Sequence, residues 1–160
     1  MTHHDWAIAV PGAADARAVE RPILGCGLFA PDEAAGFAAM VPSLLADPAQ
    51  HWRVLRTGGA VVGAAYVSLE RMSEDVWNLW FIGLDRPAQG RGGGTRLLAA
   101  VEDACREAGG RLLLVETSGA AGFEATRGFY AARGYGEEAR IRDDDAPGDD
   151  KVIFRRGLDA

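Results

Sequence analysis

Residues 87–109 read PAQGRGGGTRLLAAVEDACREAG and combine a cluster of glycines with a clear helix pattern. The apolar residues recur at the spacing of one helical face, and they are Leu97, Leu98, Val101, Ala104, Cys105 and Ala108. The glycines stand at position 90 and at positions 92–94, directly before that pattern. A glycine in a helix costs roughly 0.5–1 kcal/mol relative to alanine. So many glycines at one helix start therefore indicate a role other than helix stability.

The length and net charge of the chain predict its number of domains and argue against one class of partner. Its 160 residues predict one domain, residues 1–160, long enough to form a core without disulfides or metals. Lys and Arg number 17 against 23 Asp and Glu, so the net charge is −6. Nucleic-acid-binding proteins need a positive face, and we therefore expect no nucleic-acid partner.

The chain shows no targeting or membrane signal. Residues 1–10, MTHHDWAIAV, lack the basic region and apolar run of a signal peptide, and no stretch approaches the ~20 apolar residues of a membrane span. Cys26 and Cys105 lie far apart, which favours reduced thiols. His3 and His4 have no neighbouring ligand pattern. We expect a cytoplasmic protein with no metal site and no membrane partner.

The hydrophobic pattern predicts an α/β domain with a mixed sheet. The expected strands cover residues 6–10, 51–57, 60–70, 76–84, 111–118, 135–142 and 151–156. The expected helices cover residues 13–24, 32–45, the segment after the glycines, and 122–133. Gly58-Gly59 signals a hairpin, and Pro22 is expected to break the first helix late. The acidic stretch 143–150, DDDAPGDD, is expected to be a loop.

A buried strand that leads through glycines into a helix N-terminus is a site for a phosphate-bearing ligand, because the first N–H groups of a helix lack partners. A Walker A loop would need a lysine here, and a dinucleotide fingerprint read from Gly90 would need glycine in place of Thr95. A second pair, GCGLFA at residues 25–30, matches G-x-G-x-x-A. It lacks a clear preceding strand and is followed by Pro31.

Two motifs carry a resemblance to a known family. LWFIGLDRPAQGRGGGTRLL, residues 79–98, resembles the pyrophosphate-binding motif of the GNAT superfamily of acetyl-CoA-dependent N-acetyltransferases, with Gln89, Gly92 and Gly94 spelling Q-x-x-G-x-G. ATRGFYAARGY, residues 125–135, is similar to the late helix of that family. The resemblance implies the GNAT fold, a mixed and largely antiparallel central sheet flanked by helices, with splayed central strands that hold the cofactor. A tight turn that opens a core helix is the alternative interpretation.

The resemblance also implies acetyl-CoA as the cosubstrate and assigns its contacts. Positions 90–95 would hold the pyrophosphate, and positions 82–84 would pair with the pantetheine arm and acetyl group. The helix expected at residues 122–133 would flank the arm. The cofactor-binding positions implied in this way are Ile82, Gly83, Leu84, Gln89, Gly90, Arg91, Gly92, Gly93, Gly94, Thr95, Thr126 and Phe129.

The same resemblance places Tyr130 beside the thioester sulfur. A phenol, with an ordinary pKa of about 10, stays protonated at neutral pH and can act as the general acid. Glu116 lies on an otherwise apolar strand, where it is either the base or half of an ion pair with an arginine such as Arg127. Phe123 stands where many relatives carry an asparagine, so a mechanism that relies on that polar group does not transfer.

We expect the acceptor to be a small-molecule amine or a peptide N-terminus. Its candidate contacts are Phe29, Glu33, Asp75 and Asn78. These residues and the acidic stretch 143–150 would suit a cation, although a charge run is often a solvated turn. Family members are often homodimers, but no feature of this chain marks an interface. Two further functions stay open, an acyl-CoA-binding sensor or catalytically silent protein, and an acyltransferase that uses another acyl-CoA.

Overall fold

The computed structural model of the protein describes residues 5–159, so His3 and His4 lie outside the described residues. The strands are β1 (Trp6–Ala9), β2 (His51–Thr57), β3 (Ala60–Leu69), β4 (Val76–Leu84), β5 (Leu112–Ser118), β6 (Gly136–Ala146) and β7 (Asp149–Gly157). The helices are α1 (Ala16–Gly25), α2 (Pro31–Ala46), α3 (Gly93–Glu107) and α4 (Glu124–Ala132), with short 3-10 turns η1 (Ala13–Asp15), η2 (Arg86–Ala88) and η3 (Ala121–Phe123).

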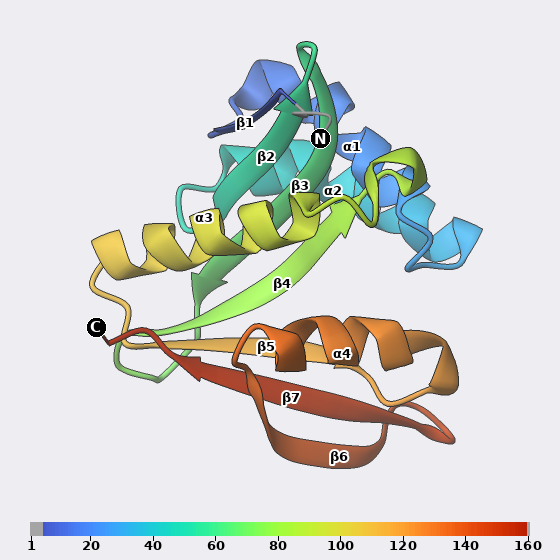
Figure 1. Ribbon diagram of the computed structural model, residues 1–160, viewed down its shortest axis with the longest axis vertical. Coiled ribbons are helices and arrows are strands. Elements are labelled where there is room, and N and C mark those ends of the chain that lie inside the picture. The colour runs from blue at the N-terminus through green and yellow to red at the C-terminus, as the bar shows by residue number, and fades with distance from the viewer. Residues whose placement is uncertain (1–4, 160) are drawn as a thin grey trace. The chain divides into compact units, whose positions relative to one another are not determined.

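The strands follow the hydrogen-bonded order β1-β2-β3-β4-β5-β7-β6 (Figure 1). The pairs β1–β2, β2–β3, β5–β7 and β6–β7 are antiparallel, whereas β4 and β5 are parallel. Parallel neighbours need a crossover, and α3 supplies it. This mixed, largely antiparallel sheet with flanking helices confirms the predicted fold class. Within residues 5–159, no helix has both the length and the apolar character that crossing a bilayer requires.

The chain divides into two compact units. Unit 1 comprises Met1–Ser68 and Phe81–Ala104, and unit 2 comprises Leu69–Trp80 and Cys105–Ala160. Strand β4 and helix α3 each contribute residues to both units. The assignment of residues 1–160 to a single domain stays a prediction.

In unit 1, helices α1 and α2 lie behind β2 and β3 in Figure 1, and α3 crosses in front of them. The rear layer buries an apolar cluster that joins both helices to the sheet, and its fully buried members include Val19, Val41, Val54 and Ala64. Gly58 and Gly59 connect β2 to β3 with φ values of +52° and +83°. Two successive left-handed residues define a type I′ hairpin turn, which confirms the hairpin prediction.

Two details of the unit 1 helices differ from the prediction. Helix α1 continues through Pro22 to Gly25, so the expected late break is wrong. Pro22 is buried beside Ile23, and this packing outweighs the one helical hydrogen bond that a proline removes. Helix α2 begins at Pro31, one residue early, because a proline is well suited to the first helical position. The Glu33 carboxylate then accepts the Ala30 N–H at 3.0 Å and caps the helix.

Unit 2 contains the first part of β4, strands β5, β6 and β7, and helix α4, which lies in front of β5 in Figure 1. The parallel ladder pairs β4 with β5 from Val76↔Leu112 to Leu79↔Val115. Strand β5 continues beyond that ladder to Ser118, and β7 pairs with it along its whole length. In the first half of β5, only alternate side chains are fully buried.

The acidic stretch 143–150 is not the expected loop. Strands β6 and β7 extend into it and leave only Pro147 and Gly148 between them. Gly148 takes a φ of +80°, and its N–H donates to Asp143 Oδ1 at 2.8 Å. The Asp143 N–H donates in turn to Asp150 Oδ1 at 3.0 Å. These carboxylates accept hydrogen bonds from the backbone of the turn, so the hairpin continues through the stretch that was expected to be a loop.

Candidate active site

The glycine-rich loop follows β4 in unit 1. Gly90 and Gly92 have φ values of +72° and +86°. Among the described residues, no atom lies within 4 Å of a Cβ built at either position. The backbone conformation, rather than packing, therefore requires glycine at both positions. Helix α3 begins directly afterwards, and the Arg96 N–H donates to Gly92 O at 3.2 Å.

Gly93 has a different reason to be glycine. A Cβ there would lie 2.7 Å from Leu84 Cδ2 and 2.8 Å from Leu55 Cδ2. The first turn of α3 thus presses directly onto the end of β4. This contact brings together two of the predicted sets of cofactor-binding residues, positions 82–84 and positions 90–95. Because the first N–H groups of a helix have no partner within it, this end of α3 is suited to an anion.

Gln89 has a structural role in this loop. Its side-chain nitrogen donates to Leu84 O at 2.8 Å and to Cys26 O at 2.9 Å. One amide therefore ties the loop to the end of β4 and to the chain that follows α1. The predicted contact between Gln89 and the cofactor stays a prediction.

The second glycine pair, at residues 25 and 27, packs against the same region. A Cβ on Gly25 would lie 2.5 Å from Asp85 Oδ1, and a Cβ on Gly27 would lie 2.7 Å from Arg86 Nη2. Asp85 is buried and its carboxylate lies 2.5 Å from Arg21 Nε. The GCG sequence therefore allows two segments to approach closely, which explains it without a second nucleotide site.

The remaining predicted residues of unit 1 lie near the end of β4. Ile82 is half-buried, and a Cβ on Gly83 would lie 2.6 Å from the Phe81 ring, so packing explains this glycine. Phe29 belongs to an aromatic cluster, with its ring centroid 5.8 Å from that of Phe37 and 5.9 Å from that of Phe81. Glu33 caps α2 and Phe29 is half-buried in this cluster, so the acceptor roles of both residues stay predictions.

In unit 2, Tyr130 is only 4% exposed and lies among aromatic rings. Its ring centroid is 5.3 Å from that of Phe129, 5.7 Å from that of Tyr135 and 5.8 Å from that of Phe154. Burial raises the pKa of the Tyr130 phenol, because charge is disfavoured away from water. The hydroxyl therefore keeps its proton throughout the neutral range.

Thr126 and Phe129 lie in α4, and Phe123 and Arg133 stand at its two ends. Thr126 is half-buried, and the Arg133 guanidinium lies 3.7 Å above the centroid of the Phe129 ring. Phe123 occupies the N-cap position and makes no side-chain capping bond. An apolar residue thus stands where the helix would accept a capping group.

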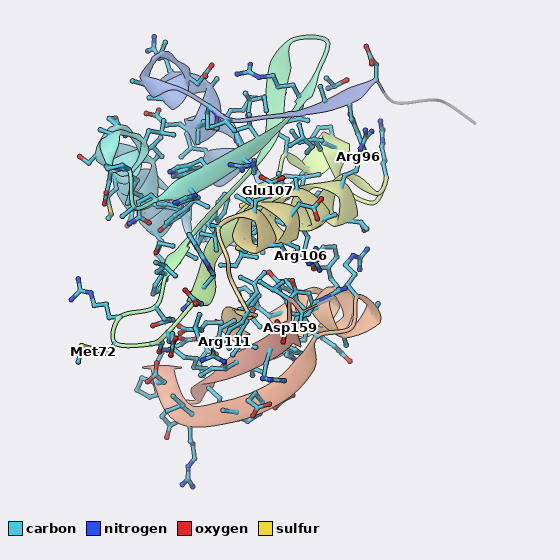
Figure 2. All side chains as sticks on the ribbon, turned by 90° about the vertical axis from the view of Figure 1, so that its left-hand side faces the viewer. Met72, Arg96, Arg106, Glu107, Arg111 and Asp159 are labelled. Carbon is cyan, nitrogen blue, oxygen red and sulfur yellow. The ribbon has the colours of Figure 1, made fainter. Side chains whose placement is uncertain are left out.

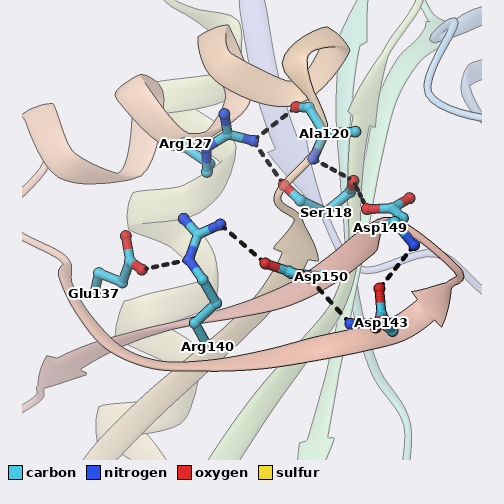
Figure 3. A network of polar contacts seen from close by, with 9 residues as sticks. Ser118, Ala120, Arg127, Glu137, Arg140, Asp143, Asp149 and Asp150 are labelled. Atoms are coloured by element: carbon cyan, nitrogen blue, oxygen red, sulfur yellow. Dashed lines mark hydrogen bonds and ion pairs between the residues drawn. The ribbon is translucent and has the colours of Figure 1, made fainter.

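The connection from β5 to α4 is fixed by a hydrogen-bonded group that Figure 3 shows. Arg127 Nη1 donates to Ser118 O at 2.8 Å and to Ala120 O at 2.9 Å. The Ser118 hydroxyl donates to Asp149 Oδ1 at 2.5 Å and accepts the Ala120 N–H at 3.0 Å. Arg127 therefore braces the start of the helix that carries Tyr130, and it is not the partner of Glu116.

Glu116 has other partners. Its Oε2 lies 3.5 Å from Lys151 Nζ, and its Oε1 accepts from Asn78 Nδ2 at 3.3 Å. The ion-pair alternative is thus met by Lys151 instead of Arg127. Asn78 is fully buried, and its Nδ2 also donates to Glu70 Oε1 at 2.5 Å. Sequence reasoning missed Glu70 and Lys151, because a charged residue just after one strand and at the start of another gives no signal of a site.

Asp75 is not among the residues that contact Glu116 or Asn78. It occupies the exposed connection between β3 and β4 with a φ of +53°, and its carbonyl accepts the Arg111 N–H at 2.9 Å. Arg111 Nε also donates to Glu74 O at 2.8 Å. Figure 2 shows Met72 projecting from the tip of the same connection. A role of Asp75 in acceptor binding stays a prediction.

Known proteins match the chain over nearly its whole length. The acetyltransferase (GNAT) family matches residues 20–135. A solved Desulfovibrio desulfuricans protein assigned to the GNAT family is 31% identical, with 96% of this chain and 99% of that chain covered and a TM-score of 0.89. No curated protein matches the chain by sequence.

More distant structures show the same fold. The ribosomal-protein-S18-alanine N-acetyltransferase of Escherichia coli is 20% identical, with a TM-score of 0.78 and coverage of 97% of this chain and 95% of that chain. The Salmonella typhimurium protein YncA, solved with its cofactor acetyl-CoA, is 17% identical, with a TM-score of 0.69 and coverage of 96% and 94%.

Proposed function

Because the chain belongs to the GNAT family of acetyltransferases, we propose that it transfers an acetyl group from acetyl-CoA to a primary amine. The observation that carries the proposal is the glycine loop after β4. Its left-handed residues, Gly90 and Gly92, open a helix whose first turn packs on the end of that strand. Acetyl-CoA bound to the distantly related YncA supports this cosubstrate.

In this proposal, the N–H groups of positions 90–95 bind the pyrophosphate at the positive end of α3. The backbone of positions 82–84 pairs with the pantetheine arm, and Thr126 and Phe129 flank it. Arg91 is exposed beside the loop and supplies a cation for a phosphate. Gln89 acts indirectly, since its amide fixes the loop on β4.

The transfer proceeds by direct attack in a ternary complex. The neutral amine nitrogen attacks the thioester carbonyl carbon, a C–N bond forms and the C–S bond breaks. The Leu84 N–H stabilises the charge that develops on the carbonyl oxygen. Tyr130 gives its hydroxyl proton to the departing thiolate, and the amine nitrogen releases one proton. Because burial raises the pKa of Tyr130, its phenolate is a strong base, so the phenol must regain a proton within the same turnover.

Glu116 is proposed as the base that removes the proton from the acceptor. An alkylamine with a pKa of about 10.4 is almost wholly protonated at neutral pH, so a nearby carboxylate or water must take up the proton. The Glu116 side chain is 32% exposed, which leaves it accessible to a ligand. The acceptor is a small-molecule amine or a peptide N-terminus. The buried thiols Cys26 and Cys105 are compatible with the reducing cytoplasm, the proposed location.

Thermal unfolding with acetyl-CoA, free CoA or NAD tests the proposal. At a hundred times its Kd, a ligand of the native state adds about 2.7 kcal/mol of stability, a shift of roughly 5–10 °C in Tm for a chain of this length. We expect this shift with both CoA species and none with NAD. No shift with either CoA species would refute the proposal. Binding without turnover on a broad amine panel would favour the acyl-CoA sensor, and tighter binding of propionyl- or succinyl-CoA would favour another acyl donor.

A further inference from the structure

The turn between β4 and the glycine loop holds a buried carboxylate. Asp85 is only 5% exposed and directly follows the last residue of β4. Its N–H donates to Val62 O at 2.8 Å, and its carbonyl accepts the Ala88 N–H at 2.8 Å. Because both bonds hold the Asp85 backbone, its side chain has a fixed starting point at the beginning of the segment that leads to Gly90 and Gly92.

The Asp85 carboxylate lies against the end of helix α1. A Cβ on Gly25, the last residue of that helix, would lie 2.5 Å from Asp85 Oδ1. Arg21, one turn earlier in the helix, places its Nε 2.5 Å from Asp85 Oδ2. Apart from that ion pair, Oδ2 has no partner in the part of the chain that the structure describes. The Arg21 charge therefore compensates this oxygen.

This end of α1 is an unfavourable place for a negative charge. The C-terminal end of a helix carries the negative end of its dipole, which favours a cation. Burial also disfavours the Asp85 charge unless an opposite charge compensates it. An apolar pair of similar size often stabilises a fold as well as a buried ion pair does. The Arg21–Asp85 pair is therefore better explained by the geometry that it imposes.

Further contacts join the same two segments of unit 1. Gln89 Nε2 donates to Cys26 O at 2.9 Å, and a Cβ on Gly27 would lie 2.7 Å from Arg86 Nη2. Positions 85, 86 and 89 thus all contact the end of α1 or the residues directly after it. The segment that leads to the glycine loop is held on α1, and α1 can therefore influence where the loop lies.

We propose that Arg21 and Asp85 are positioning residues for acetyl-CoA, and that they hold the glycine loop in the conformation that binds the pyrophosphate. This inference rests on the proposed function. The pair keeps the loop in place before the cofactor arrives, so less ordering is required on binding. When the pair is broken, the loop is in place for a smaller fraction of the time, and the apparent Kd rises by the reciprocal of that fraction.

Calorimetric titration of the full chain with acetyl-CoA tests the inference, together with the Tm of each variant. Arg21→Gln and Asp85→Asn should each raise the Kd about tenfold, the loss of one charge-assisted contact. An effect of charge alone would have opposite signs in the two variants. Loss of the Arg21 cation would then weaken binding of the anionic cofactor, whereas loss of the Asp85 anion would strengthen it.

A second ion pair in unit 1 supplies the matched control. Arg56 Nη2 lies 2.8 Å from Asp15 Oδ1 and joins β2 to η1. Arg56→Gln removes the same kind of charge as Arg21→Gln and breaks a pair at another place in the unit. It should lower the Tm and leave the Kd of acetyl-CoA unchanged.

Two glycine variants test the same contact without a change of charge. Gly25→Ala would place a methyl group 2.5 Å from Asp85 Oδ1 and should displace the carboxylate, so the Kd should again rise about tenfold. Gly36→Ala makes the same change in α2, where no described atom lies within 4 Å of the new Cβ, and should leave the Kd unchanged. Alanine favours the helix at both positions, so a weaker helix cannot explain a loss of affinity in Gly25→Ala.

Hydrogen exchange without ligand measures the loop directly. The Ala88 amide, which donates to Asp85 O, should exchange faster in Arg21→Gln than in Arg56→Gln. If acetyl-CoA binds the unmodified protein and the Arg21 and Asp85 variants keep its Kd, the positioning role is wrong and acetyl transfer stands. A lower Kd in Asp85→Asn would likewise overturn the positioning role. If the amide exchanges faster but acetyl-CoA does not bind the unmodified protein, the pair still holds the loop and the proposed function is wrong.

Discussion

The glycine loop of unit 1 and the surroundings of Tyr130 in unit 2 offer different chemical groups. The loop presents backbone N–H groups, and its glycines matter because they carry no side chain, as the φ of +86° at Gly92 requires. Helix α4 presents one phenol, whose proton is retained because aromatic rings bury it. Backbone sites are broken by adding atoms, whereas side-chain sites are broken by removing them. This difference predicts opposite kinds of damaging substitution in the two units.

The largest effect is expected from Gly92→Val. A β-branched residue resists a positive φ and would cover the N–H groups of the loop, so acetyl-CoA affinity should fall about a hundredfold, the equivalent of two charge-assisted contacts. Gly59→Val is the matched control, because Gly59 has a φ of +83° and equally open space. Calorimetry with acetyl-CoA measures both variants. Equal losses in the two variants would show that strain, and not the loop, governs binding.

Tyr130→Phe should have the next largest effect. Removal of one hydroxyl should lower kcat about tenfold or more, as is typical of a general acid, while the affinity for acetyl-CoA persists. Steady-state kinetics and thermal unfolding with acetyl-CoA provide the two readings. A kcat equal to that of the unmodified protein would remove the phenol from the chemistry and weaken the contrast between the two regions.

Gln89→Ala tests how far the loop depends on a side chain. Its two hydrogen bonds, to the carbonyls of Leu84 and Cys26, hold the loop on β4. We expect a loss of about 1 kcal/mol of folding free energy and a modest loss of acetyl-CoA affinity, both measurable by denaturant unfolding and calorimetry. Unchanged stability with strongly reduced affinity would instead make Gln89 a direct contact of the cofactor.

The smallest effect is expected from Asp15→Asn in unit 1. The Gly12 N–H, followed by the Arg56 side chain, lowers the pKa of the Asp15 carboxyl below its ordinary value of about 3.9. The unfolded chain then binds the proton more readily, so the charge stabilises the fold above that value and the gain is lost as pH falls through the folded pKa. Asp15→Asn should lower Tm slightly at pH 7 and match the unmodified protein in strong acid. Asp5→Asn serves as the control, and a Tm difference that persists in acid would contradict the charge argument.

Where one local signal dominates, the sequence predicted the structure well. Strand β4 has the predicted bounds, Val76–Leu84, because nine apolar-rich residues stand between polar turns. The Gly58-Gly59 pair also predicted its hairpin correctly, and both glycines take the positive φ of the turn.

Elsewhere a tertiary or local contact outweighed the pattern. Pro22 continues a helix because it is buried, and the acidic hairpin forms because Asp143 and Asp150 bond its backbone. Motifs in the sequence predicted most residues of the candidate site, but no motif predicted which side chains contact Glu116. The bonds to Asn78 and Lys151 join residues from three strands, and no spacing along the chain encodes them.

The two buried cysteines have a practical consequence for kinetics. Cys26 lies in unit 1 and Cys105 in unit 2, and both thiols are enclosed. Burial raises the pKa of the Cys26 thiol, so a thiolate-seeking reagent reacts with it slowly while the fold is closed. Each thiol becomes reactive only when its surroundings open. The two alkylation rates of the unmodified protein therefore time the opening of each unit separately, and acetyl-CoA should slow the opening of any unit that it binds.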